Sequence, residues 1–187
     1  MLARIFGLTR SVPDLRAAIV EVLSDIAGET LGRKAAECFD DPERFEQLCA
    51  ESHTEPPWMS DDRDPTPGER AAGIFFQLLQ DEGRSDVIDW AYGGTEVVHV
   101  IQELLRKAGA ECFGKEELEQ FTALAGNAGR GKAFAKLDGP LKTAVQKRGL
   151  VLAYLDRDAD AYFPILVSPE VHAKWSKLRF DADHRIL

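Results

Sequence analysis

Apolar residues recur every three or four positions along most of the first 148 residues of this chain. That spacing is typical of amphipathic helices. It predicts helices over residues 12–27, 30–39, 69–82, 95–108 and 115–125, one from residue 42 onwards, and two short ones around 134–137 and 140–148. In the helix over 115–125 the buried face is expected to carry Leu118, Phe121 and Leu124. Gly28, Gly83, Gly109 and Gly149 are expected to end helices, because glycine readily takes the backbone conformation of a helix C-terminus.

The pattern changes over residues 149–168, where two apolar runs flank a turn that holds three aspartates. Short unbroken apolar runs bounded by a turn are consistent with buried strands, and here they predict a hairpin. Pro164 lacks a backbone donor, so the second strand is expected at a sheet edge, or to start at Ile165. Ser168 is placed to cap a last helix. Residues 180–187 are expected to form a polar tail.

These elements predict an α+β fold that is mostly helical, with a small antiparallel C-terminal sheet. A chain of 187 residues suits a single domain, residues 1–187. Its helical part covers about residues 1–148, the hairpin and its capping helix residues 149–178, and the tail residues 179–187. Residues 87–90 are expected to be extended, with Trp90 packed in the core. Residues 53–67 contain four prolines and are expected to form a loop.

The formal net charge of −9 is unevenly distributed. Residues 29–64 hold eleven acidic against four basic side chains, whereas residues 104–150 hold nine basic against five acidic ones. An acidic protein is repelled by nucleic acid and by anionic membranes, and it suits a basic protein partner. No run approaches the roughly 20 apolar residues of a membrane span, and the apolar start is too short for a signal peptide. Three cysteines without metal or redox spacing favour the reducing cytoplasm.

Asp156, Asp158 and Asp160 alternate as the first three ligands of an EF-hand calcium loop do. The rest of that motif is missing, because Ala161 replaces the glycine and Val167 the final glutamate. The favoured interpretation is a turn whose aspartates hydrogen-bond their own backbone. The alternative is a weak divalent-cation site or a metal-dependent hydrolase centred on these three residues.

Two other segments resemble ligand-binding motifs. Residues 126–132 spell the phosphate-loop pattern G-x-x-x-x-G-K, but a helix is predicted before it and Ala133 stands in place of Ser or Thr, so nucleotide binding is not expected. Residues 130–148 carry six basic side chains and could contact nucleic acid as part of a regulator, although a solvated helix face has the same spacing. The four histidines are scattered, and no catalytic residues and no cofactor are predicted.

Candidate binding residues lie where aromatic or apolar side chains occur in polar loops. Trp58 and Met59 stand among prolines and aspartates, and Tyr92 precedes a glycine pair. Such side chains, surrounded by charge, are typical anchors of protein interfaces.

Three motifs give the chain a resemblance to known proteins. They are Asp-Asp-Pro-Glu at residues 40–43, Asp-Trp at 89–90, and Leu-Asp-x-Asp-x-Asp-x-Tyr at 155–162 followed by Leu-Val-x-Pro-Glu at 166–170. Together they resemble an uncharacterised family of bacterial domains of unknown function, over most of residues 35–178. That resemblance implies a small bacterial protein and supplies no catalytic residues. In size and charge the chain is also loosely similar to bacterial toxin-immunity proteins.

The sequence therefore favours a non-enzymatic, acidic protein-binding module of the bacterial cytoplasm. An immunity-like role is one form of this hypothesis. The metal-dependent protein and the nucleic-acid regulator are its alternatives.

Overall fold

The computed structural model describes residues 12–52, 65–128, 131–156, 160–181 and 185–186. Within them lie eight helices and four strands. The helices are α1 (Val12–Ala27), α2 (Glu29–Asp40), α3 (Pro42–Glu51), α4 (Pro67–Asp81), α5 (Gly94–Lys107), α6 (Lys115–Ala125), α7 (Ala133–Gln146) and α8 (Pro169–Trp175). The strands are β1 (Ile88–Asp89), β2 (Val151–Asp156), β3 (Ala161–Val167) and β4 (Arg185–Ile186).

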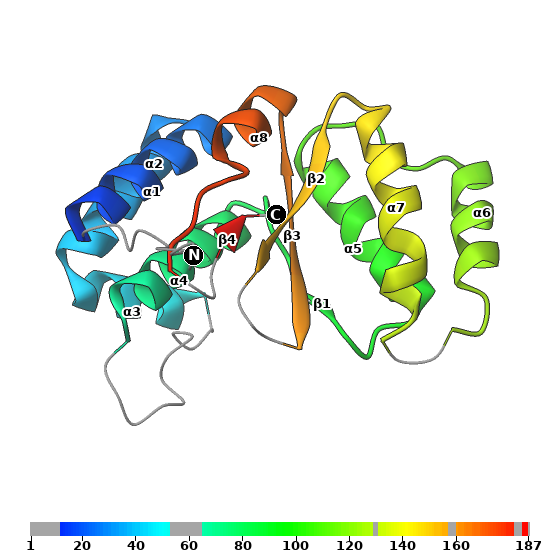
Figure 1. Ribbon diagram of the computed structural model, residues 1–187, viewed down its shortest axis with the longest axis horizontal. Coiled ribbons are helices and arrows are strands. Elements are labelled where there is room, and N and C mark those ends of the chain that lie inside the picture. Colours follow the sequence, from blue (N-terminus) through cyan, green and yellow to red (C-terminus); the bar gives the residue numbers. More distant parts are fainter. Residues whose placement is uncertain (1–11, 53–64, 129–130, 157–159, 182–184, 187) are drawn as a thin grey trace, which may run out of the picture.

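The four strands form one antiparallel sheet in the order β1-β3-β2-β4. The predicted hairpin is its centre, with Val151 opposite Val167 and Leu155 opposite Phe163. The sheet stands between two groups of helices: α1–α4 with α8 on one side, and α5–α7 on the other (Figure 1). The mostly helical α+β fold predicted from the sequence is confirmed.

Each face of the sheet contributes to a separate hydrophobic core. Ala153 and Leu155 belong to the core made with α1–α4 and α8, whereas Leu152 and Tyr154 belong to the core made with α5–α7. Successive side chains of a strand point to opposite faces, so a strand covered on both faces needs apolar residues at every position. This double burial explains the unbroken apolar run of β2.

Several predicted helix boundaries are confirmed by their caps. The Asp41 carboxylate accepts a hydrogen bond from the Glu43 N–H at 3.1 Å at the start of α3. The Ser168 hydroxyl accepts one from the Val171 N–H at 3.2 Å at the start of α8. Gly83 and Gly109 follow α4 and α5 with φ of 65° and 69°, a left-handed conformation that favours glycine.

Both predictions made from Pro164 are wrong: β3 lies between β1 and β2 instead of at a sheet edge, and it begins at Ala161 instead of Ile165. The Pro164 carbonyl accepts a hydrogen bond from the Ser85 hydroxyl at 2.9 Å, on the β1 side. The nitrogen of a strand residue faces the same side as its carbonyl. The missing donor of Pro164 therefore faces the side where the two-residue β1 pairs only with Ala161 and Tyr162.

The two short helices predicted around Pro140 are one continuous helix, α7, so that prediction is also wrong. Proline removes one hydrogen bond but holds φ near the helical value, so a helix can continue through it. Leu137, Leu141 and Val145 are all buried in the same core, and this shared burial favours the continuous helix.

The polar tail predicted for residues 180–187 contains buried structure instead. Phe180 and Ile186 are buried, and β4 pairs with β2 through Leu155 and Asp156. This segment has too few apolar positions to show the alternation of a strand, so its sequence pattern does not predict β4. Leu124, predicted on the buried face of α6, is 48% exposed.

Candidate protein-binding surface

Trp90 and Tyr162 are large aromatic residues that the fold leaves at the surface, 44% and 36% exposed. The prediction that Trp90 packs in the core is therefore wrong. Trp90 follows the end of β1, where its N–H donates to the Asp160 carbonyl at 3.3 Å and its carbonyl accepts from the Gly131 N–H at 2.7 Å. These backbone bonds fix the residue where three chain segments meet.

Tyr162 contacts the first turn of α7, and Trp90 lies beside the residues that precede that turn. Tyr162 stacks on Phe134, with ring centroids 3.6 Å apart and an interplanar angle of 20°. A Cβ added to Gly131 would lie 3.8 Å from the Trp90 ring, so the indole lies beside the residues that lead into α7. We call Trp90, Tyr162, Phe134 and Tyr154 the aromatic edge.

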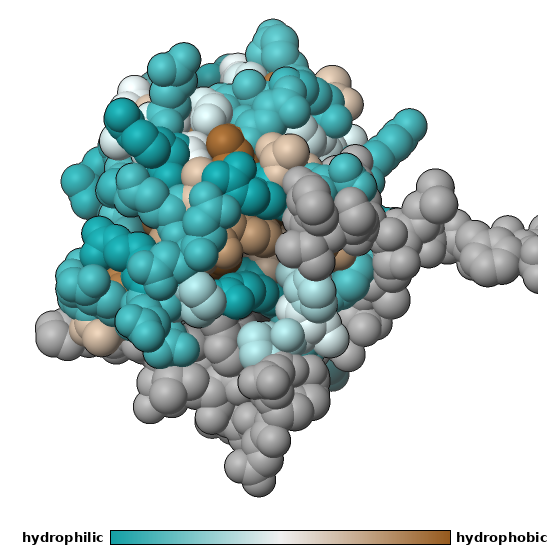
Figure 2. Space-filling view, turned by 90° about the vertical axis from the view of Figure 1, so that its left-hand side faces the viewer, coloured by the Kyte–Doolittle hydropathy of each residue, from teal (hydrophilic) through white to brown (hydrophobic). Residues whose placement is uncertain are grey.

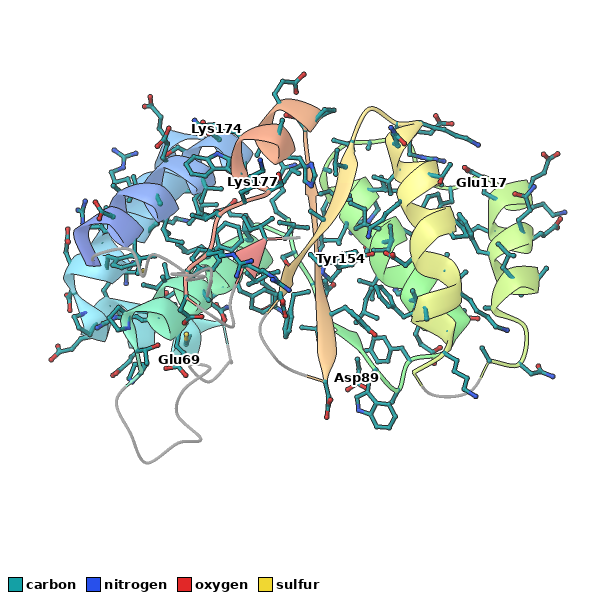
Figure 3. All side chains as sticks on the ribbon, in the orientation of Figure 1. Glu69, Asp89, Glu117, Tyr154, Lys174 and Lys177 are labelled. Carbon is teal, nitrogen blue, oxygen red and sulfur yellow. The ribbon has the colours of Figure 1, made fainter. Side chains whose placement is uncertain are left out.

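The inner end of the aromatic edge is anchored in the core. Phe134 packs edge-on against Tyr154, with centroids 5.4 Å apart, and the Tyr154 hydroxyl donates to the Asp138 carboxylate at 2.8 Å. Burial, together with the neighbouring Asp138 charge, raises the pKa of Tyr154 far above its usual range. Figure 3 shows Tyr154 between the sheet and α7. The hydroxyl is therefore a hydrogen-bond donor that fixes the aromatic edge, and it does not ionise near neutral pH.

The chain around Trp90 is acidic. The Asp89 carboxylate accepts from the Ala91 N–H at 2.6 Å, and the Asp89 carbonyl from the Tyr92 N–H at 3.0 Å, which together form a tight turn. Asp89 lies at the lower end of the sheet in Figure 3. Asp160 is exposed next to this turn, and Lys132 is an exposed basic residue near it. An exposed indole with carboxylates nearby suits a cationic partner.

The predicted binding residues fall in different places. Tyr92 lies in the same turn as Trp90, half-buried and packed against the core of α5–α7. Trp58 and Met59 lie outside the residues that the structure describes. The sequence signal that could have identified the aromatic edge is the run Asp89-Trp90-Ala91-Tyr92 before two glycines, since turn residues seldom bury a large side chain.

The predicted cation site is only partly described. Asp156 accepts a hydrogen bond from the Arg185 guanidinium at 3.1 Å, and Asp160 is exposed at the start of β3. Asp158 lies outside the described residues. Within those residues, no three His, Cys, Asp or Glu side chains are grouped so that they could hold a metal ion. The site of Asp156, Asp158 and Asp160 stays a prediction.

Part of the basic segment over residues 130–148 stabilises the protein internally. The Arg148 guanidinium forms two hydrogen bonds with the Glu117 carboxylate, at 3.1 and 2.6 Å, and also donates to the carbonyls of Glu111, Cys112 and Ala144. Lys142 pairs with Asp138 at 3.1 Å. Arg148 thus joins the end of α7 to the start of α6, a role that the sequence pattern did not reveal.

The three cysteines remain thiols, and two of them are buried. Burial raises the pKa of Cys38 to about 11. A thiol with so high a pKa is a poor nucleophile at neutral pH. Cys38 is therefore a core residue and no candidate for catalysis.

Seven acidic side chains lie on α2, α3 and the junction between them. They are Glu29, Glu37, Asp40, Asp41, Glu43, Glu46 and Glu51. Only three basic residues accompany them, Arg33, Lys34 and Arg44. Figure 2 shows mostly hydrophilic surface on the described residues of the face that includes these helices.

The fold and this surface define a two-core α+β domain built around a four-stranded antiparallel sheet, with an aromatic edge. The chain belongs to the family described as a domain of unknown function, DUF6630, whose model matches residues 17–187. No curated protein and no solved structure shows significant similarity to it. None of the helices in the described residues is both long and apolar enough to cross a membrane.

Proposed function

We propose that this domain binds a basic partner protein, and that the aromatic edge is the anchor of the interface. The observation that carries the proposal is the exposure of two aromatic side chains that the fold holds in place. Backbone hydrogen bonds to Asp160 and Gly131 fix Trp90, and Tyr162 stacks on Phe134. Tryptophan and tyrosine dominate the binding energy of interfaces when they are held in place before the partner arrives. Trp90 meets that condition through its backbone bonds, and Tyr162 meets it through its stacking on Phe134.

Charge supports a basic partner. The acidic residues of α2 and α3 and the net charge of −9 attract a cationic protein over a distance of about one Debye length, roughly 8 Å at physiological salt. Asp89 and Asp160 act at short range beside the indole. The acidic helices would thus speed the encounter, and the aromatic edge would slow dissociation.

A bacterial cytoplasmic location fits the three thiols of the chain. An immunity-like role, in which the partner is a secreted toxin, is one form of this proposal. A toxin gene next to the gene for this protein would favour that form, and protection of cells that co-express both would test it.

A peptide-display selection tests the proposed interface. A random peptide library is selected on the wild-type protein after counter-selection on a Trp90→Ala, Tyr162→Ala double variant. We expect enriched peptides rich in Arg and Lys, whose binding weakens with added salt and is lost in the double variant. Leu124→Ala is the matched control, because Leu124 is an exposed apolar residue of α6 outside the aromatic edge. Peptides without basic excess, or peptides that bind the double variant equally well, would contradict the proposal.

A further inference from the structure

The first half of β2 forms an edge of the sheet that no described strand covers. On the side away from β3, β4 pairs with Leu155 and Asp156 alone. Leu152 thus lies beyond the cover that β4 provides.

The backbone of Leu152 directs its polar groups to this edge. The Pro164 carbonyl faces the β1 side, so the alternate residues Ile165 and Val167 face β2. Their partners, Ala153 and Val151, therefore use their N–H and C=O groups toward β3. Leu152 lies between these two residues, and its N–H and C=O point the opposite way.

A groove of about 430 Å³ lies at the same edge, between α7 and α8. Its lining includes Leu150, Val151 and Leu152 from the start of β2, Lys142 and Gln146 from α7, and His172 from α8. A strand edge inside a groove between two helices has the form of sites that bind a peptide as an additional strand.

The charge of this region favours an acidic occupant. Lys142 and His172 come from opposite sides of the groove. A second hollow of about 360 Å³ next to β4 is lined by Lys177, Arg179 and Arg185 among others. Nearby Asp138 and Asp156 already pair with Lys142 and Arg185, at 3.1 Å in each case. The four basic side chains, Lys142, Lys177, Arg179 and Arg185, outnumber these two carboxylates, so this edge is locally basic in a protein that is acidic overall.

We propose that this groove binds an extended acidic segment of a partner protein, which adds as a strand along residues 151–154 of β2. Leu152 is 2% exposed, so the arriving segment must turn aside the long polar side chains that line the groove. Lys142 can turn aside at low cost, because its side chain is 46% exposed. The site adjoins the aromatic edge at Tyr154, whose ring lies 4.9 Å from the Lys142 ammonium, but it uses neither Trp90 nor Tyr162 and does not depend on the function proposed there.

A synthetic peptide tests this site directly. The probe is a blocked peptide of four Glu-Val repeats with a fluorescent label, titrated with the full-length protein in low salt and followed by fluorescence anisotropy. We expect saturable binding, and amide exchange of Leu152, measured by NMR, that slows by about tenfold or more in the complex. A Lys-Val peptide of equal length should leave the amide exchange of Leu152 unchanged, even if it binds elsewhere on this acidic protein.

Two variants separate a docking site from nonspecific charge. Lys142→Ala should weaken binding of the Glu-Val peptide by about fivefold or more, because it removes a charged side chain from the groove. Lys115→Ala, which removes an 89% exposed lysine of α6, should change it by less than about twofold. Absence of saturable binding, unchanged Leu152 exchange in the complex, or equal losses in the two variants would each overturn the proposal.

Discussion

At the scale of single residues, Arg148 joins several segments of the α5–α7 half through its guanidinium group. Its side chain is 8% exposed, it bonds both oxygens of Glu117, and it lies over the Phe113 ring at 4.8 Å. A guanidinium with this many fixed acceptors cannot be replaced by an ammonium group without loss. Composition identified Arg148 only as one of several basic residues, since its partners are brought together by the fold.

Replacing Arg148 should therefore destabilise the protein. Arg148→Ala is expected to lower the free energy of unfolding by about 3 kcal/mol or more, because it leaves the Glu117 carboxylate without its partner. Lys147→Ala, at the neighbouring exposed position, should change it by less than about 0.5 kcal/mol. Urea denaturation of both variants measures the difference. Equal losses of unfolding free energy in the two variants would show that the bonds of Arg148 do not stabilise the protein.

The same pair predicts a dependence of stability on pH. Hydrogen bonds from Arg148, and a further one from the Gly114 N–H, lower the pKa of Glu117 below its ordinary value of 4.5. A carboxyl group with a lower pKa in the folded state stabilises the protein fully above the unfolded-state pKa. That contribution is lost as the pH falls through the folded-state pKa.

The Glu117→Gln variant isolates this contribution, since glutamine keeps the shape but not the charge. The difference in unfolding free energy between wild type and variant should be largest at pH 7 and should shrink as the pH falls below about 4.5. Urea titrations at several pH values measure it. A difference that is constant with pH would contradict the ion pair.

At the scale of elements, the sequence predicted where most helices begin and end, because caps and glycines act locally. Asp41 and Ser168 illustrate this, as each bonds a backbone N–H within three residues. The sequence failed where distant segments decide the outcome. Pro164 is accepted in the middle of the sheet because its missing donor faces the side where the two-residue β1 does not reach it, and there Ser85, far away in the chain, donates to its carbonyl. Ile186 is buried because β2 offers it a pairing position.

A substitution in α7 tests whether this helix is continuous through residues 138–140. Gly139 lies inside α7, is exposed, and leaves open space where a Cβ would be added. Gly139→Ala should raise the free energy of unfolding by about 0.5–1 kcal/mol, because alanine has the higher helix propensity. A loss of stability would indicate instead that the chain breaks at residues 138–140, as the sequence pattern alone predicted.

Gly94 is the matched position at which the same change should be harmful. A Cβ added there would meet the Ala125 side chain, where α5 and α6 pack closely. Gly94→Ala should lower the free energy of unfolding by about 1–3 kcal/mol, a typical cost of overpacking. Thermal or urea denaturation measures the change in unfolding free energy for both variants. If both variants are stabilised, or both are destabilised, the surroundings described for one of the two glycines are wrong.

At the scale of the whole molecule, the sheet joins two helical groups that differ in charge. The acidic residues concentrate on α2 and α3, and the basic excess lies in the α5–α7 half. The sequence predicted this asymmetry, because charge can be counted without a structure. It could not predict the aromatic edge, which exists only because Trp90, Phe134 and Tyr162 come together from three segments.

Everything proposed for the aromatic edge requires that Trp90 anchor a basic protein partner. The most direct measurement is the dissociation constant of a basic peptide from the display selection, determined by calorimetry for the wild-type, Trp90→Ala and Leu124→Ala proteins. We expect Trp90→Ala to weaken binding by about tenfold or more, as at an interface hot spot, and Leu124→Ala to change it by less than about twofold. Equal affinities for the wild-type and Trp90→Ala proteins would contradict it.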